Sequence, residues 1–189
     1  EFHKIKKIAL NKRLNLNFID HKKNNFKILS HNFQGESQIL KIKYDNTIRL
    51  VKLNLIGKIQ LKNLLMAIIA AKKSKLKLKK IFESIPKIKP VEGRFQKIGK
   101  IKNGSLVILD YAHTPEALKT CLLNLREQFP LKKISLLFGC GGNRDQNKRS
   151  KMGKIASLYA DQIYLTDDNP RKENPDKIRK DIKRGINIK

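Results

Sequence analysis

Short apolar segments alternate with helical patterns through the second half of this chain, and this alternation constrains its fold more than any other feature. Apolar runs at 106–109, 133–138 and 162–165 predict three strands, and a helical pattern follows each of them. Strands that alternate with helices at short intervals are typical of a parallel sheet with crossover helices. We therefore predict an α/β fold in which the three strands lie in one sheet and end at the same edge.

The helices that follow these strands have recognisable start signals and apolar faces. Thr114 and Pro115 are predicted to be the N-cap and the first residue of one helix. The last helix is predicted to begin at Asn174-Pro175-Asp176. The apolar faces of the first two helices comprise Leu118, Leu122, Leu125 and Phe129 in one and Met152, Ile155, Ala156 and Tyr159 in the other.

The first half of the chain has a different organisation. A helix is predicted over about the first 20 residues. Segments 38–44 and 48–56 flank the turn signal Asp45-Asn46, which predicts a β-hairpin. Segment 63–71 is apolar on all sides, as expected of a buried helix, and 78–85 has the spacing of an amphipathic helix.

Polar segments follow all three predicted strands of the second half. They are Asp110-Tyr111-Ala112-His113-Thr114-Pro115, Gly139-Cys140-Gly141-Gly142-Asn143-Arg144-Asp145 and Thr166-Asp167-Asp168-Asn169-Pro170-Arg171. Open α/β sheets bind ligands beyond the carboxyl ends of their strands, so these segments are candidates for one site. Asp168, Asn169 and Arg171 could hold the ammonium and carboxylate of an amino acid, because a guanidinium pairs bidentately with a carboxylate.

Each of these segments also has a purely structural interpretation. Residues 166–171 fit an Asx-turn with a proline that caps the next helix. The segment 139–142 is typical of a loop that needs positive φ, and an anion nest is only one use of such a loop. His113 fits a hydrogen-bonded turn, and Arg144 fits a surface pair with Asp145. Spacing alone leaves both interpretations open.

Composition argues against several functional classes. The net charge of +27 would suit nucleic acid, but the lysines are spread over nearly the whole chain and aromatic residues are not interleaved with them. No apolar run approaches the ~18 residues of a membrane span, and the N-terminus lacks a signal-peptide pattern. Cys121 and Cys140 form no C-x-x-C pair, which favours a reducing compartment. We predict a cytoplasmic chain without membrane insertion.

Four motifs, in their order and spacing, resemble the Mur ligases. They are DYAHTPEAL at 110–118, GCGGNRD at 139–145, KRSKMG at 148–153 and TDDNPR at 166–171, and a weaker similarity begins at Gly57. Within the family they are similar to the members that add the third amino acid of the peptidoglycan stem peptide.

The resemblance implies two domains. Residues 1–91 would be the C-terminal portion of a central ATP-binding domain, with helices and a small antiparallel sheet. Residues 92–189 would be a truncated, Rossmann-like amino-acid-binding domain, and Pro90-Val91-Glu92-Gly93 would link the two. The phosphate-binding loop G-x-x-x-x-G-K-[ST] is absent from the sequence, so we expect an interior fragment of a longer ligase that is inactive alone.

The resemblance also implies the reaction and its partners. ATP would phosphorylate the D-glutamate carboxylate of UDP-MurNAc-L-Ala-D-Glu, and the amine of meso-diaminopimelate would attack the acyl phosphate. The cofactors would be ATP and Mg²⁺, with the Mg²⁺ ligands mostly outside this chain, and the enzyme would be a monomer. Because family members that use lysine lack the arginine of DNPR, Arg171 points to meso-diaminopimelate, whose second carboxylate it would pair.

Site residues carry over from the family motifs position by position. Those implied to contact ATP are Gln60, Asn63, Arg94, Asp110, His113 and Arg144. Those implied around meso-diaminopimelate are Arg149, Asp168, Asn169 and Arg171. The resemblance assigns no catalytic side chain and no metal ligand within this chain. In place of the family's usual Asn, this sequence has Gln60.

Three alternatives remain open from the sequence. A related folylpolyglutamate-synthetase-like ligase would share the ATP chemistry without needing DNPR after this strand. A basic nucleic-acid-binding protein would retain tight DNA binding at high salt. A noncatalytic amino-acid-binding module would bind meso-diaminopimelate without any dependence on ATP.

Overall fold

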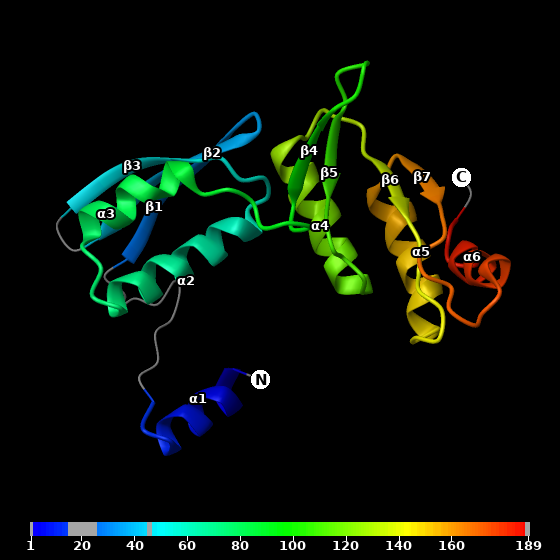
Figure 1. Cartoon of the computed structure of the whole chain (residues 1–189), viewed down its shortest axis with the longest axis horizontal. Coiled ribbons are helices and arrows are strands. Elements are labelled where there is room, and N and C mark those ends of the chain that lie inside the picture. The colour runs from blue at the N-terminus through cyan, green and yellow to red at the C-terminus, as the bar shows by residue number, and fades with distance from the viewer. Residues whose placement is uncertain (1, 15–25, 45–46, 188–189) are drawn as a thin grey trace. The chain divides into compact units, whose positions relative to one another are not determined.

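A computed structural model of the chain describes residues 2–14, 26–44 and 47–187. The contacts divide the chain into two compact units (Figure 1). Unit 1 comprises Glu1–Leu55 and Ile59–Lys89, and unit 2 comprises Ile56–Lys58 and Pro90–Lys189. The fold is mixed α/β, as the strand–helix alternation predicted.

Unit 1 contains a three-stranded antiparallel sheet in the order β1-β2-β3. Its strands are β1 (Phe26–Gln34), β2 (Ser37–Tyr44) and β3 (Thr47–Leu53). The predicted hairpin of β2 and β3 is confirmed by the pairing of the two strands, although its turn residues, 45 and 46, lie outside the described residues. Strand β1 was not predicted, because a bulge between Ile28 and Ser30 breaks its alternation.

Three helices of unit 1 share a hydrophobic core with its sheet. Helix α2 (Ile59–Lys73), helix α3 (Leu78–Ser84) and the short 3-10 helix η1 (Ile85–Lys87) share a core with β2 and β3. The prediction that the central helix is buried on all sides was wrong, because Met66 of α2 is 52% exposed. The amphipathic pattern predicted over α3 is confirmed, with Ile81 buried.

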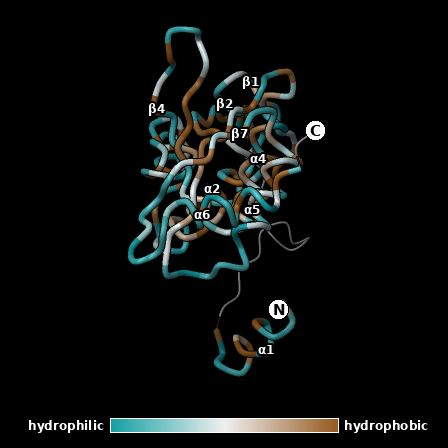
Figure 2. The backbone as a smooth tube through the Cα atoms, turned by 90° about the vertical axis from the view of Figure 1, so that its right-hand side faces the viewer, coloured by the Kyte–Doolittle hydropathy of each residue, from teal (hydrophilic) through white to brown (hydrophobic). Residues whose placement is uncertain are grey.

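The first helix is shorter than predicted. Helix α1 (Phe2–Asn11) ends about one turn before the described segment does, rather than near residue 20. Arg13 has a φ of 52°, and Leu14 N donates to Ala9 O, so a left-handed residue terminates the helix. Figure 2 shows that α1 alternates between hydrophilic and hydrophobic residues, as an amphipathic helix does. The predicted continuation over 15–20 lies outside the described residues.

Unit 2 contains two small sheets and three helices. Strands β4 (Gln96–Lys100) and β5 (Leu106–Leu109) form an antiparallel pair, and β6 (Ser135–Phe138) and β7 (Gln162–Leu165) form a parallel pair. The helices are α4 (Pro115–Gln128), α5 (Asn147–Tyr159) and α6 (Pro175–Lys183). A core of Leu118, Leu122, Cys140, Met152, Ile178 and Ile182 joins them.

The prediction of one three-stranded parallel sheet was wrong in its pairing. Strand β5 pairs with β4, a strand that was not predicted, instead of with β6. The connection between β4 and β5 is a tight turn, in which Gly104 has a φ of 80° and Ile101 N donates to Ser105 O. A short loop closes an antiparallel hairpin easily, so β5 pairs with β4, the strand next to it in the sequence.

The predicted helix starts are confirmed. Thr114 is the N-cap of α4, and its hydroxyl accepts a hydrogen bond from Ala117 N at 3.2 Å. Asn174 is the N-cap of α6, and its side chain accepts from Asp176 N at 2.8 Å. Because Pro115 and Pro175 follow these caps, the backbone enters each helix with φ already restricted.

Candidate functional site

Two loops of unit 2 leave adjacent parallel strands and meet. We call residues 139–146, between β6 and α5, the glycine loop, and residues 166–174, between β7 and α6, the proline loop. Phe138 and Leu165, the last residues of β6 and β7, are register partners. The two loops therefore begin side by side at the carboxyl ends of a parallel pair, where α/β sheets place their ligands.

Backbone and side-chain hydrogen bonds join the two loops along their length. Gly142 N donates to Asn169 O at 2.9 Å, and Arg171 Nη1 donates to Gly142 O at 2.8 Å. Lys172 N donates to Asn143 Oδ1 at 3.0 Å. These bonds confirm that the segments after the second and third predicted strands come together.

The glycines of the glycine loop allow this close approach. A Cβ on Gly142 would lie 1.8 Å from Pro170 O, and one on Gly139 would lie 2.4 Å from Thr166 O. Neither residue has a positive φ, so the interpretation that these glycines supply positive φ was wrong. The residues with positive φ are instead Asn143, at 51°, and Arg171, at 52°. Such conformations are uncommon for residues other than glycine and cluster at functional sites.

The proline loop contains the Asx-turn that its sequence suggested. Asn169 Oδ1 accepts from Arg171 N at 3.0 Å, and Asp168 Oδ1 accepts from Asn169 N at 2.7 Å. The proline that opens the next helix is Pro175, however, and not Pro170. Arg171 Nη1 is bound to backbone oxygens, whereas its Nη2 and Nε make no hydrogen bond or ion pair to the described part of the chain. One edge of this exposed guanidinium thus remains available for a carboxylate.

Arg149 lies in the interior beneath both loops. Its side chain has no exposed surface, and its Nη1 forms ion pairs with Glu173 at 2.9 Å and with Asp181 at 3.0 Å. Its Nη2 donates to Glu173 Oε1 at 3.0 Å and lies 3.4 Å from Gly141 O. The hydrogen bond to Glu173 is the main cause that raises the pKa of Arg149 above its ordinary value. This guanidinium is buried and compensated by two carboxylates, unlike that of Arg171.

The same network makes the stability of unit 2 depend on pH. The hydrogen bond from Arg149, followed by that from Asn143 N, lowers the pKa of Glu173 below its ordinary value. Its contribution to stability is therefore complete above the unfolded pKa and is lost as pH falls through the lower folded pKa. We expect the wild type to melt at a higher temperature than Glu173→Gln at about pH 6. The difference should shrink as pH falls from there toward about pH 3. A difference that stays constant over this range would contradict the assignment.

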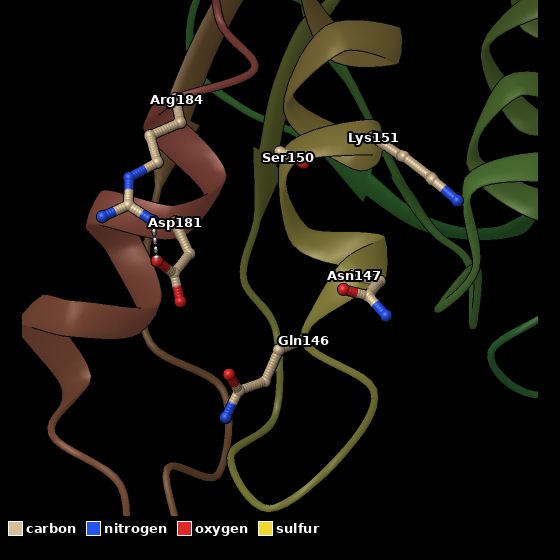
Figure 3. A pocket seen from close by; sticks show the side chains of 6 residues that line it. All are labelled: Gln146, Asn147, Ser150, Lys151, Asp181 and Arg184. Atoms are coloured by element: carbon tan, nitrogen blue, oxygen red, sulfur yellow. Dashed lines mark hydrogen bonds and ion pairs between the residues drawn. The ribbon is translucent and has the colours of Figure 1, made fainter.

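A polar pocket of about 550 Å³ borders this network between α5 and α6 (Figure 3). It is lined by Gln146, Asn147, Ser150, Lys151, Asp181 and Arg184. In Figure 3, the Lys151 side chain points away from Asp181 and Arg184. Arg184 Nη1 pairs with Asp181 at 3.0 Å. Asp181 is therefore shared between an exposed arginine on the pocket side and the buried Arg149.

The segment after β5 brings together several residues that the family resemblance connects with ATP. Asp110 Oδ2 accepts from Phe95 N at 2.9 Å, and the Arg94 guanidinium lies 5.1 Å from the centre of the Tyr111 ring. Tyr111 contacts His113 edge to face, with ring centres 5.1 Å apart. Cation–π contact of this kind restricts the guanidinium without neutralising it.

This segment is tied to the start of α5. Lys148 Nζ donates to His113 O at 2.7 Å, and His113 Nδ1 lies 3.1 Å from Tyr111 O, which confirms the hydrogen-bonded turn at His113. Arg144 is exposed in the glycine loop. The interpretation of Arg144 and Asp145 as a surface pair is not supported, because no ion pair joins them among the described residues and Asp145 Oδ1 accepts from Asn147 N at 2.9 Å.

Gln60 and Asn63 lie on α2 of unit 1. Gln60 is buried and Asn63 is exposed, and Asn63 Nδ2 donates to Gln60 Oε1 at 3.1 Å. The bond fixes the orientation of one amide by the other. These two residues belong to a different unit from the other predicted site residues.

Three residues that surround the predicted site could not be named from the sequence motifs. Glu173 and Asp181 hold Arg149, and Lys148 connects α5 to the segment after β5. A signal for the first two was present, because Arg149 falls in phase with the apolar residues Met152 and Ala156 at helical spacing. An arginine on a buried face requires carboxylate partners, which the sequence offers downstream.

The described part of the chain contains neither a metal-binding cluster nor a membrane-spanning helix. No group of three or more His, Cys, Asp and Glu side chains there is arranged to hold a metal ion. No described helix is long and apolar enough to cross a membrane.

Comparison with known proteins adds the following similarities. Residues 93–189 match the family model for the Mur ligase, glutamate ligase domain. A Rickettsia typhi protein named UDP-N-acetylmuramoyl-L-alanyl-D-glutamate–2,6-diaminopimelate ligase is 40% identical over 175 residues, which are 86% of this chain and 35% of that protein. A protein of the same name from Prochlorococcus marinus is 46% identical over 139 residues, covering 71% of this chain and 27% of its own length. The chain thus spans about a third of the length of the curated relatives it matches.

Solved structures show the same relationship. One of a UDP-N-acetylmuramoyl-L-alanyl-D-glutamate–2,6-diaminopimelate ligase is 32% identical with a TM-score of 0.62, covering 89% of this chain and 34% of that chain. Mycobacterium tuberculosis folylpolyglutamate synthase, solved with ADP and AMPPCP, has a TM-score of 0.76 at 15% identity, covering 97% of this chain and 41% of that chain. The second likeness shows a shared fold only.

Proposed function

Because the chain belongs to the Mur ligase family, we propose that the protein containing it joins meso-diaminopimelate to UDP-MurNAc-L-Ala-D-Glu with ATP, for peptidoglycan synthesis. The observation that carries this proposal is the junction of the glycine and proline loops, which leaves one edge of the Arg171 guanidinium free. Relatives that are 40% and 46% identical have names with this substrate and this amino acid.

The proposed amino-acid site uses charge on both sides of the acceptor. Nη2 and Nε of Arg171 would bind the carboxylate that distinguishes meso-diaminopimelate from lysine, because the guanidinium fork matches a carboxylate. Asp168 would attract an ammonium group, and Asn169 holds the turn that presents Arg171. An arginine left without its carboxylate would disfavour lysine.

Arg149 needs a separate account within this proposal. Its guanidinium is buried and already paired with two carboxylates, so direct contact with the amino acid would require Glu173 or Asp181 to give way. We therefore propose that Arg149 contributes to binding of the amino acid chiefly by holding the two loops in place. Direct pairing of Arg149 with a substrate carboxylate is the competing assignment.

The family motifs connect six residues with ATP. Asp110, whose Oδ2 is fixed by Phe95 N, would accept from the ribose hydroxyls, and Arg94 would reach the phosphates. Gln60 and Asn63 would contact adenine, and His113 and Arg144 would lie near the nucleotide. Folylpolyglutamate synthase, which shares the fold, was solved with ADP and AMPPCP. We further propose that the reaction takes place in the cytoplasm, where ATP and UDP-linked sugars are found. The active protein is proposed to be a monomer.

The chemistry assigned to this chain is positioning. A carboxylate is a poor electrophile, so ATP must convert it to an acyl phosphate before an amine attacks. Holding the amine near that carbonyl supplies much of the rate, since orientation alone is worth several powers of ten. We assign no catalytic side chain here. We propose that the Mg²⁺ ligands lie mostly outside this chain, because the described residues include no group of three or more His, Cys, Asp and Glu side chains that could hold a metal ion.

The domain division follows the same proposal. We propose that residues 1–91 belong to the ATP-binding domain and residues 92–189 to the amino-acid-binding domain. In support, the family model begins at residue 93 and the contacts divide the chain between Lys89 and Pro90.

Replacing Arg171 by methionine tests the proposed function. We expect kcat/KM for meso-diaminopimelate to fall by about 10²-fold or more, because a charge-assisted bidentate bond is lost. The selectivity for meso-diaminopimelate over lysine should fall with it, while KM for ATP stays unchanged. Acceptor-dependent phosphate release measures all three quantities, with Lys172→Met, at the exposed neighbouring position, as the control. Unchanged selectivity in Arg171→Met would remove Arg171 from the site.

A folylpolyglutamate-synthetase-like reaction is the alternative that the sequence left open, and the likeness to one such enzyme, at 15% identity, supports the shared fold alone. It predicts phosphate release with a folate and glutamate, and none with the UDP-linked substrate. The same assay separates the two candidates.

A further inference from the structure

Glu173 is bound on both of its carboxylate oxygens at the junction of the two loops. Oε1 accepts from Asn143 N and, at 3.0 Å, from Arg149 Nη2. Oε2 pairs with Arg149 Nη1 at 2.9 Å and accepts from Gln146 Nε2 at 3.4 Å. The side chain is only 13% exposed. A proline-loop carboxylate thus binds the backbone and a side chain of the glycine loop and the first turn of α5.

The backbone group that Glu173 holds is next to the one that orients Arg171. Asn143 has a φ of 51°, a conformation that must be held by its surroundings. The preceding residue, Gly142, presents the carbonyl that accepts from Arg171 Nη1 at 2.8 Å. Release of Asn143 would therefore displace the carbonyl to which the Arg171 guanidinium is attached.

The other partner of Arg149 has no such connection. Asp181 lies on α6 and pairs with Arg149 at 3.0 Å and with the exposed Arg184 at 3.0 Å. Its bonds reach neither Asn143 nor the other backbone groups of the glycine loop. Glu173 and Asp181 therefore compensate the same buried cation, but only Glu173 also joins the loops.

We propose that Glu173 is a positioning residue, which locks the glycine loop to the proline loop and thereby aims Arg171 at the incoming amino acid. The inference rests on the proposed function, because it assigns Glu173 to the acceptor site of that reaction. Glu173 acts through Asn143 and Gly142 and touches no substrate itself. Its carboxylate is kept ionised by Arg149, so the lock holds at neutral pH.

The test compares Glu173→Gln with Asp181→Asn in the full-length ligase. Both changes remove one carboxylate charge from Arg149 and keep the side-chain size, so they should lower the melting temperature similarly. Only Glu173→Gln should raise KM for meso-diaminopimelate, by about tenfold or more, since small misplacements of a binding group are costly. KM for ATP should stay within about twofold of wild type in both variants. Glu173→Asp, which restores the charge but not the reach, provides an intermediate case.

Hydrogen exchange gives a readout that does not depend on activity. Peptides that cover 139–146 and 166–174 should lose protection in Glu173→Gln and keep it in Asp181→Asn. Equal loss of protection, or equal shifts of KM, in the two variants would overturn the positioning role and leave Glu173 a stability residue. If the wild-type ligase releases no phosphate with meso-diaminopimelate, the proposed function fails instead, and the exchange result alone decides whether Glu173 locks the loops.

Discussion

Arg149→Met is expected to destabilise unit 2 by about 3–5 kcal/mol, because it leaves two carboxylates beneath the loops without their cation. Arg149 has no exposed surface, and Glu173 and Asp181 are only 13% and 14% exposed. Methionine fills a similar volume but offers no donor, so Glu173 loses its cation and Asp181 keeps only its pair with the exposed Arg184. Native-state hydrogen exchange at the amides of α5 and α6 in the full-length protein measures the loss.

Arg184→Met is the matched control for this prediction. Arg184 pairs with the same Asp181 carboxylate at the same 3.0 Å, but its side chain is 77% exposed. Exposed ion pairs contribute little, so we expect a change within about 1 kcal/mol. Similar losses in the two variants would show that the buried network does not stabilise unit 2 as described.

Gly142→Ala is expected to abolish the junction of the glycine and proline loops. The added Cβ would lie 1.8 Å from Pro170 O and 2.6 Å from Pro170 C, and backbone atoms cannot rotate away as a side chain can. Separation of the loops by about 1 Å should lower kcat/KM for meso-diaminopimelate by about 10²-fold. The loss of stability should be about 1–3 kcal/mol, as for other overpacked sites.

Gly99→Ala controls for the general effect of adding a methyl group to unit 2. A Cβ there meets no atom within 4 Å, and Gly99 does not have a positive φ. We expect wild-type kinetics from this variant. Activity of Gly142→Ala equal to that of Gly99→Ala, in the same phosphate-release assay, would contradict the proposed contact between the loops.

Local features of the fold could be predicted from the sequence because local signals determine them. The strand at 106–109 and the caps at Thr114 and Asn174 depend on residues within one turn or one strand. Strand pairing could not be predicted in the same way. Whether β5 pairs with β4 or with β6 depends on contacts between segments. Strand β4 also has the composition of a loop, because it contains Gly99 and three polar or charged residues.

The candidate site shows the same distinction between features that local sequence determines and features that depend on contacts between segments. Family motifs identified the two segments that meet, and the structure brings them together through Gly142 and Asn169. The need for glycine at 142 could not be predicted, because it arises from the close approach of Pro170, which lies 28 residues farther along the chain. Helical periodicity could have predicted that Arg149 is buried, but the spacing of the sequence does not specify its two carboxylate partners.

The most direct test is mass analysis of the product formed by the full-length ligase from ATP, UDP-MurNAc-L-Ala-D-Glu and equal amounts of meso-diaminopimelate and lysine. We predict that the UDP-linked substrate gains one meso-diaminopimelate residue and that phosphate is released in the same amount. A product that contains lysine would support the ligase reaction but contradict the proposed role of Arg171 in selecting the amino acid. Absence of any product, with the substrates intact, would contradict the proposed function itself.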